Sequence, residues 1–233
     1  MLSIIIPTYN EAQYLPRLLY SIKRQTFKNY EIIVADANSS DNTRAVAESV
    51  GCRVVSGGSP SEGRNYGAGV ASGSIFLFLD ADVVLASPYF LEKTIKEFER
   101  KKLGVATCRI KPLSDKKVDK FFHDFYNKYS RITRPVRAHA PGFCIFARKD
   151  VHQMIGGFDE GIKLAEDQDY VVRATKQGSF RILKSASLYV SVRRFNRDGR
   201  FNVAVKYLFC ELYMLTGGRI RSDIFNYTFG HKE

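Results

Sequence analysis

The feature that most constrains the fold is an alternation of short apolar runs and helix-like stripes in the first half of the chain. Apolar runs that suit buried strands cover residues 2–6, 32–35, 53–55 and 75–79. Between them lie stripes with the spacing of an amphipathic helix, the clearest from Leu15 to Ile22. Repeated strand–helix alternation predicts a doubly wound α/β sheet.

Capping and turn residues predict where several elements begin and end. A helix is expected over residues 41–50, ending before Gly51. Ser87 and Pro88 are interpreted as the N-cap and first residue of another helix. Residues 57–73 form a glycine- and serine-rich segment that contains Arg64. Further along, the pattern indicates a strand over residues 143–147 and a helix over residues 166–176.

Composition narrows the class of protein. The chain has 233 residues, of which 45% are hydrophobic and 26% charged, as in a packed globular protein rather than a disordered one. No apolar run approaches the roughly 18–20 residues of a membrane span. The start of the chain resembles no secretory signal, and the four cysteines are widely spaced. These features predict a cytoplasmic protein, with peripheral placement at the cytosolic face of a membrane left open.

Polar clusters follow three of the predicted strands, at residues 7–11, 36–38 and 80–82. Ligands of open α/β sheets bind at the carboxyl ends of the strands, so these clusters mark the expected site. The glycine motifs of dinucleotide-binding, P-loop and serine-hydrolase folds do not occur at the expected places. Asp80 and Asp82, separated by Ala81, offer the oxygen ligands that Mg²⁺ or Mn²⁺ prefers. The alternative is that both acids only cap the following loop.

Several segments together resemble the family 2 glycosyltransferases. They are SIIIPTYNE, VADANSSDNT, GRNYGAGVASGSIFLFLDAD, GGFDE and AEDQDYVVRA, in the family's order over roughly residues 2–180. The resemblance implies a single GT-A-type, Rossmann-like α/β domain with a mostly parallel central sheet flanked by helices. It also implies an inverting hexosyltransferase that uses a UDP- or GDP-linked sugar and Mn²⁺ or Mg²⁺.

The resemblance assigns the donor-binding residues one by one. Asp36 would hydrogen-bond the base, and Arg64 would meet the base or the diphosphate. Asp82 would be the principal metal ligand, and Asp80 would approach the ribose or the metal. The remaining expected nucleotide contacts are Pro7, Thr8, Tyr9, Glu11 and Ala81. Asp36 as a helix-capping residue, and Arg64 as a solvated loop charge, are the alternatives.

An acidic segment supplies the expected catalytic base. On a helix from residue 166, Asp167 shares a face with Tyr170 and Val171, whereas Glu166 and Asp169 align with Arg173. An inward, partly desolvated carboxylate has a raised pKa and suits proton abstraction from an acceptor hydroxyl. Asp167 is therefore the predicted base, with Glu166 as its catalytic neighbour. The alternative is that these acids only complement the helix dipole.

The net charge of +12 is concentrated outside the first half of the chain, with +8 over residues 109–149 and +6 over residues 181–233. Arg193 and Arg194 resemble basic pairs of small family members and are candidate phosphate ligands, or else a surface pair. The apolar stretch 201–215 either packs on the sheet or lies at a membrane interface near a lipid-linked acceptor. Because the sequence does not decide between these two placements of residues 201–215, peripheral membrane contact is left open.

The expected organisation is one domain in three parts. Residues 1–108 form the nucleotide-sugar-binding half, residues 109–192 the acceptor-binding half, and residues 193–233 a basic, apolar, helical C-terminal appendage. A sugar-phosphate nucleotidyltransferase is the main alternative, although its glycine-rich, basic loop after the first strand has no counterpart here. A nucleic-acid-binding module is a weaker alternative. It is motivated by aromatic residues among the basic ones, namely Phe121, Phe122, Phe125, Tyr126 and Tyr129. Residues 118, 121, 122, 125 and 129 fit one helical face, which is expected to pack as core or lid, so no nucleic-acid partner is predicted.

Overall fold

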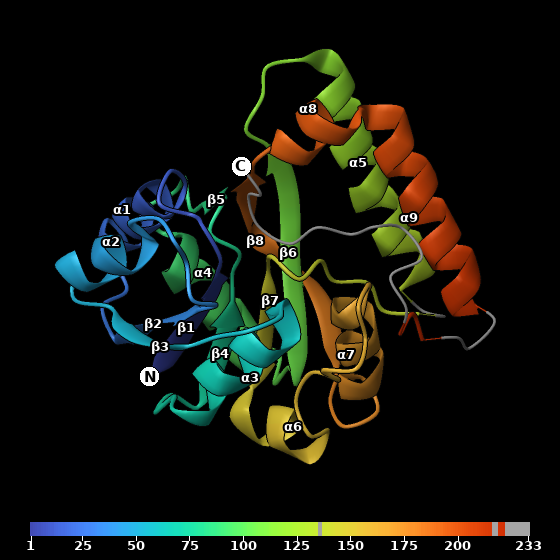
Figure 1. Ribbon diagram of the computed structural model, residues 1–233. Helices are drawn as coiled ribbons and strands as arrows, with labels where there is room; N and C mark the ends of the chain where they lie inside the picture. Colours follow the sequence, from blue (N-terminus) through green and yellow to red (C-terminus); the bar gives the residue numbers. More distant parts are fainter. Residues whose placement is uncertain (135–136, 216–218, 222–233) are drawn as a thin grey trace.

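The computed structural model describes residues 1–134, 137–215 and 219–221. Within them, eight strands form one sheet in the order β3-β2-β1-β4-β7-β6-β8-β5, flanked by helices (Figure 1). Four of the seven strand pairs are parallel, namely β1–β2, β1–β4, β2–β3 and β6–β8. The predicted α/β class with a mostly parallel sheet is confirmed.

The first half of the chain builds the parallel side of the sheet. Its elements are β1 (Leu2–Thr8), α1 (Leu15–Lys23), β2 (Tyr30–Asp36), α2 (Thr43–Ser49), β3 (Arg53–Ser56), α3 (Pro60–Gly69) and β4 (Ile75–Phe78). Each predicted apolar run is a strand, and β1 lies between β2 and β4. The loops that follow these strands therefore meet at one edge of the sheet.

The second half extends the sheet through an antiparallel strand. Its elements are β5 (Val83–Val84), α4 (Phe90–Arg100), β6 (Val105–Pro112), α5 (Lys117–Thr133), β7 (Ile145–Arg148), α6 (Lys149–Met154), α7 (Glu166–Ala174), β8 (Phe180–Val190), α8 (Arg193–Asp198) and α9 (Arg200–Leu215). β7 runs antiparallel to both β4 and β6 and joins the two halves. β6 continues across residue 108, the predicted boundary of the nucleotide-sugar-binding part, with a shift of its register to β8 between Cys108 and Arg109.

Apolar side chains fill both faces of the sheet because successive residues of a strand point to opposite sides. Ile4 and Ile6 of β1 belong to the cluster that also holds α1 and α4. Ile5 belongs to the other cluster, with Phe78 of β4 and Tyr170 of α7. All of these side chains are fully buried, so the position of α7 is fixed by the core itself.

Two helices begin later than the capping side chains predicted. α2 starts at Thr43 and α4 at Phe90, rather than at the positions indicated by Asp41 and Ser87. The carbonyls of Ser87 and Pro88 instead accept hydrogen bonds from the Gln25 side chain and the Thr26 amide, at 2.9 and 2.8 Å. Those bonds hold the segment as a turn before the helix.

The glycine-rich segment contains a helix, α3, that the sequence analysis did not predict. Ser59 and Glu62 form a reciprocal capping box at its start, with Pro60 in the first turn. A Cβ on Gly67 would lie 2.5 Å from Ile5 Cγ2, and one on Gly63 would lie 3.1 Å from Pro7 Cβ. The glycines therefore allow α3 to pack closely on the sheet.

Three of the five residues in the predicted α5 stripe do not pack as predicted, whereas Phe122 and Tyr129 are half-buried. Val118, Phe121 and Phe125, expected in a core or lid, are exposed by 43%, 65% and 60%. α9 lies beside α5 (Figure 1), where Arg200 bonds Asp119 at 2.7 Å. Six large apolar side chains within residues 201–215 are between 45% and 78% exposed, so most of this stretch does not pack on the sheet, in contrast to the first of the two predictions.

Candidate active site

The loops after β1 and β2 are joined by hydrogen bonds at the carboxyl edge of the sheet. Thr8 Oγ1 donates to Asp36 Oδ1 at 3.0 Å, and the Ala37 amide donates to the Thr8 carbonyl at 2.9 Å. Asp36 also accepts from the Ser39 amide and hydroxyl at 3.0 and 2.6 Å. The buried Asp36 carboxylate thus shapes its own loop, and its place at the strand end keeps it beside the β1 loop.

Glu11 lies buried at the start of the helical turn before α1. Its amide donates to Thr43 Oγ1 at 2.7 Å, and the preceding Asn10 adopts a left-handed backbone with φ of 53°. That turn directs the Glu11 side chain inward, where only 3% of the residue is exposed. Burial raises the pKa of Glu11 to about 7, although Arg193 opposes the shift.

Arg193, at the first position of α8, joins Glu11 to the second acid of the Asp80-Ala81-Asp82 motif. Its two terminal nitrogens donate to the Glu11 carboxylate at 2.8 and 2.7 Å, and its Nε lies 2.7 Å from Asp82 Oδ2. The guanidinium also lies over the Tyr14 ring, 4.7 Å from the centroid. One half-buried cation from the C-terminal part of the chain therefore pairs with two carboxylates that both come from the first 82 residues.

Burial also raises the pKa of Asp82, against the lowering effect of Arg193. Asp80, in contrast, keeps 36% of its side chain exposed, and Ala81 between them is buried. Asp82 therefore faces the protein interior, and Asp80 faces a more open space.

Arg64 holds a second group of acids together. This residue is 2% exposed and donates to Glu166 Oε1 at 2.8 Å and to Asp80 Oδ1 at 3.1 Å. Its guanidinium lies 5.2 Å from the centroid of the Phe158 ring. Arg64 is therefore a buried, paired residue of α3, and the interpretation as a solvated loop charge is wrong. Glu166 pairs with Arg64 rather than with Arg173, because α7 begins beside α3.

Asp167 is fixed by backbone donors at the start of α7. Its Oδ2 accepts from the Gly142 amide at 2.6 Å, and its Oδ1 accepts from the Gln168 amide at 2.8 Å. Burial, followed by the neighbouring Glu166 carboxylate, raises the pKa of Asp167 to about 7, while Arg64 and the two amides oppose the shift. A carboxyl with such a pKa can exchange a proton near neutral pH.

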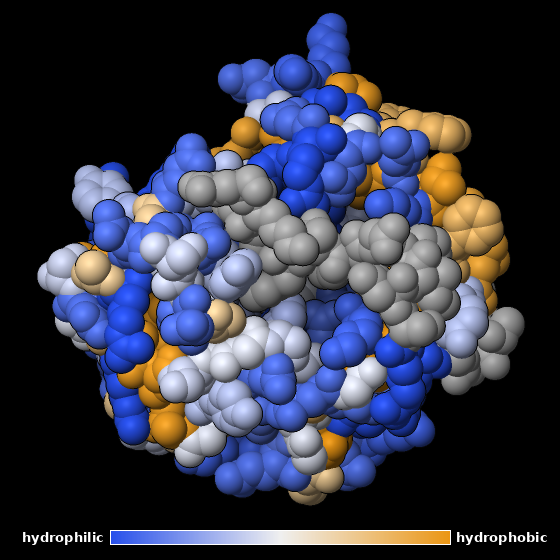
Figure 2. Space-filling model, in the orientation of Figure 1, coloured by the Kyte–Doolittle hydropathy of each residue, from blue (hydrophilic) through white to orange (hydrophobic). Residues whose placement is uncertain are grey.

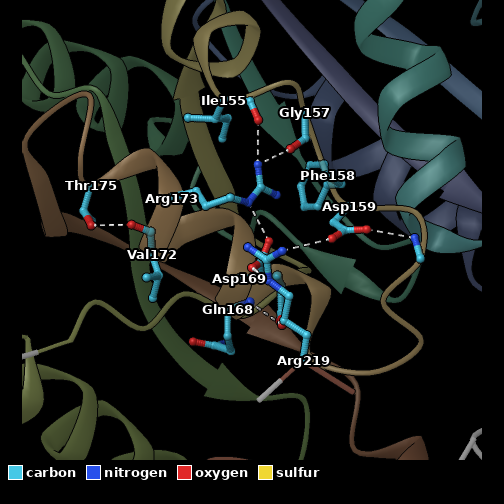
Figure 3. Close-up of polar contacts among 12 residues, drawn as sticks. Ile155, Gly157, Phe158, Asp159, Gln168, Asp169, Val172, Arg173, Thr175 and Arg219 are labelled. Carbon is cyan, nitrogen blue, oxygen red and sulfur yellow. Dashed lines mark hydrogen bonds and ion pairs between the residues drawn. The ribbon is translucent and has the colours of Figure 1, made fainter. Parts of the chain in front are cut away.

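A further ionic cluster holds α7 and the loop before it (Figure 3). Arg173 donates to Asp169 at 2.6 Å and to the carbonyls of Ile155 and Gly157 at 2.8 Å each. Arg219 adds a contact to Asp169 at 3.0 Å. Asp169 and Arg173 align as predicted, and they fix the loop whose Phe158 ring lies under Arg64.

The remaining predicted residues occupy less central positions. Pro7 is buried in β1 beneath α3, and Tyr9 is half-buried in the loop after β1. Arg194 donates to the Tyr207 hydroxyl of α9 at 3.1 Å, and its charge also lowers the pKa of Asp82, against the effect of burial. Gly142 and Phe158 were not predicted, although the GGFDE segment that carries Phe158 was recognised as part of the motif set.

The carboxylates of Asp80 and Asp82 are hard oxygen donors of the kind that Mg²⁺ and Mn²⁺ prefer. Asp82 is already paired with Arg193, and within the described residues no three acidic, His or Cys side chains are placed to hold a metal ion. Two protein carboxylates completed by phosphate oxygens nevertheless match the usual mode of Mg²⁺ binding. The residues therefore suit a cation that arrives with a phosphorylated ligand.

Comparison with known proteins identifies the family. The model of glycosyl transferase family 2 matches residues 3–156, more than half of the chain, and the chain belongs to this family. Matched regions cover 23% to 64% of the length of the curated relatives compared, so the chain spans less than two thirds of each of them. A Campylobacter jejuni protein, a GalNAc(5)-diNAcBac-PP-undecaprenol beta-1,3-glucosyltransferase, is 37% identical over 97 residues, which are 37% of this chain and 31% of that protein.

Two solved structures share the fold. Staphylococcus aureus TarS in complex with UDP has a TM-score of 0.67 at 23% identity, over 82% of this chain and 60% of that one. The mannosyltransferase PcManGT of Pyrobaculum calidifontis, in complex with GDP-Man and Mn²⁺, has a TM-score of 0.69 at 20% identity, over 82% and 56%. The GT-A architecture implied by the sequence motifs is therefore confirmed.

Proposed function

We propose that this chain transfers a sugar from a UDP- or GDP-linked donor to an acceptor hydroxyl, with inversion at the anomeric carbon. The observation that carries this proposal is the pair of acidic groups at the carboxyl edge of the sheet. Asp82 and Glu11 surround Arg193, and Glu166 and Asp80 surround Arg64, with Asp167 next to Glu166. The UDP and GDP-Man complexes of the structural neighbours support a nucleotide ligand at this edge.

Each group has a separate role in this proposal. Asp80 and Asp82 would hold Mn²⁺ or Mg²⁺, which neutralises negative charge on the diphosphate when bound. Arg193, released from Asp82, would turn a guanidinium toward the phosphate oxygens. Asp36 and the loop at Thr8 and Tyr9 would contact the base and ribose.

Asp167 would accept the proton of the acceptor hydroxyl as that oxygen attacks the anomeric carbon. The Gly142 and Gln168 amides orient its carboxylate, and its raised pKa gives it the basicity for this step. Arg64 keeps Glu166 paired, so that only one of the two adjacent acids is left to take a proton.

The acceptor in this proposal is a carbohydrate or a lipid-linked sugar, and the chain meets the latter by peripheral membrane contact. The undecaprenol-linked acceptor in the name of the Campylobacter relative supports this choice. No helix in the parts of the chain that the structure describes is both long and apolar enough to cross a bilayer.

Calorimetry with UDP and GDP, each with and without Mn²⁺, tests the donor site. We expect metal-dependent binding that Asp82→Ala abolishes and Asp167→Asn preserves. A transfer assay with the preferred nucleotide sugar should then show loss of activity for Asp167→Asn. Absence of binding by either nucleotide would refute the proposal, and so would full transfer activity of Asp167→Asn.

A further inference from the structure

The outer side of α5 carries a continuous apolar row that the fold leaves uncovered. Its members recur at intervals of three, four and seven residues, and each is between 43% and 73% exposed. They are Val118, Phe121, Phe125 and Ile132. The opposite side of the same helix carries the buried Asp119, His123 and Ser130. The exposed side of α5 therefore carries large apolar side chains, whereas its buried side carries polar ones.

A second apolar row lies on α9. Phe201, Leu208, Phe209 and Leu212 are between 52% and 78% exposed, whereas Val203 and Cys210 are buried. α9 runs parallel to α5. Arg200 at its start bonds Asp119, and Glu211 near its end lies beside Tyr129, whose pKa is raised to about 12 by burial and by that carboxylate. Figure 2 shows hydrophobic surface gathered along the edge where Figure 1 places these two helices.

We name the two apolar rows together the α5–α9 face. Contiguous exposed apolar patches mark interaction sites in many proteins. Its charge indicates which partner it fits. Lys117, Lys120, Lys128 and Arg131 of α5 are exposed, against one exposed acid, Asp124, in this fully described helix. Lys206 adds a further exposed cation on α9.

The position of Lys128 favours a lipid surface over a second copy of the chain. Lys128 falls within the α5 row, between Phe125 and Ile132, where a dimer contact would bury its charge. At a bilayer its stem can lie among the apolar side chains while the ammonium reaches the headgroups. Exposed phenylalanines and basic residues on one helix are also the composition of interfacial helices.

We propose that the α5–α9 face docks on the surface of a bilayer that contains anionic lipid. This inference deepens the membrane contact of the proposed function and rests on it. It specifies the surface that contacts the lipid, and it assigns that surface to α5 as well as to α9. Arg193 at the start of α8 links this face to the donor site, because α8 leads directly into α9.

Co-sedimentation with vesicles tests the proposal. We compare vesicles of phosphatidylcholine alone with vesicles in which about a third of the lipid is phosphatidylglycerol. The full chain should bind the second kind, and binding should weaken as salt is raised, because exposed charges are screened. A double variant, Phe125→Glu with Leu208→Glu, should bind about tenfold more weakly or worse.

The matched control is Tyr20→Glu with Met154→Glu. Both residues are exposed, by 63% and 57%, and lie on α1 and α6, away from the α5–α9 face. This pair of substitutions adds the same negative charge as the first pair. It therefore distinguishes the effect of losing apolar contact at the α5–α9 face from the effect of net charge on vesicle binding. We expect it to leave binding within about threefold of the unmodified chain.

Three results would overturn the proposal. The first is that the unmodified chain does not bind vesicles, and the second is that both double variants lose vesicle binding equally. The third is that light scattering shows a dimer, which Phe125→Glu with Leu208→Glu dissociates, while the unmodified chain does not bind vesicles. None of these measurements involves nucleotide. A chain that binds UDP or GDP with Mn²⁺ but not vesicles therefore contradicts the docking face alone, whereas vesicle binding without nucleotide binding contradicts the transferase proposal alone.

Discussion

Replacing Arg64 by methionine tests whether this side chain holds the centre of the candidate site together. Arg64 is 2% exposed, bonds Glu166 at 2.8 Å and Asp80 at 3.1 Å, and lies over the Phe158 ring. Methionine fills a similar volume but removes the cation. The change leaves two carboxylates, and Asp167 next to them, with no neutralising partner on α3.

The expected cost follows from how buried each partner is. Removing one member of a buried ion pair costs about 3–5 kcal/mol, because the other charge is left desolvated and unpaired. The Glu166 side chain is 17% exposed and takes nearly this full penalty, whereas Asp80 is 36% exposed and is partly solvated. We therefore expect Arg64→Met to lower the free energy of unfolding by about 3 kcal/mol.

Urea denaturation followed by far-UV circular dichroism measures this change, since the chain has no tryptophan to report by fluorescence. The matched control is Arg44→Met, which removes an exposed pair with Glu48 whose side chains are 59% and 54% exposed. That pair should be worth less than about 0.5 kcal/mol. Adding Glu166→Gln to Arg64→Met should restore part of the loss. A cost below about 1 kcal/mol for Arg64→Met, or one equal to the control, would refute the reasoning.

Four further predictions concern the same site. Transfer activity should fall as pH is lowered through about 7, because protonated Asp167 cannot accept a proton, and a rate unchanged from pH 8 to pH 5 would contradict this role. The same raised pKa means that the folded chain binds this proton more tightly than the unfolded chain, so its contribution to stability is lost as pH rises through about 7. Asp167→Asn should reduce this dependence in denaturation curves, and the part that remains is expected from Glu11, whose pKa is also raised to about 7. Gly142→Ala should lower the free energy of unfolding by about 1–3 kcal/mol, since the new Cβ would lie 2.7 Å from Arg64 Nη2, and unchanged stability would show that Arg64 can move. Arg193→Met should strengthen binding of Mn²⁺ alone in calorimetry, because the guanidinium no longer neutralises Asp82, and weaker binding would indicate that Arg193 organises the carboxylates instead.

Much of the fold could be predicted from the sequence because most elements of the first half are indicated by the pattern of their own residues. The apolar runs of β1 and β4 and the stripe of α1 need only their own residues to be recognised. α3 was missed although its signal was present. Ser59, Pro60 and Glu62 form a capping box with proline in the first turn. The surrounding glycines obscured it, because glycine in a helix interior is unfavourable unless close packing requires it.

The sequence predicted several residues of the candidate site but not the hydrogen bonds and ion pairs between them. Asp80, Asp82 and Asp167 were each singled out from strand ends and helix faces, and their roles stay predictions until tested. Their partners could not be deduced, because nothing local relates Glu11 to Arg193, 182 residues further along the chain. Gly142 was missed for the same reason, since its importance comes from Arg64 and Asp167 packing against it.

The sequence alone predicted most strands and helices of the first half in their order, the acids at the carboxyl edge of the sheet, and the inward face of Asp167. Each of these depends on the spacing of neighbouring residues, which is a local property. The pairing of each acid with its cation, and the exposure of the apolar row of α5, could be seen only in the folded chain. Periodicity shows that two faces of a helix differ, but which face is buried depends on what the rest of the chain places beside it.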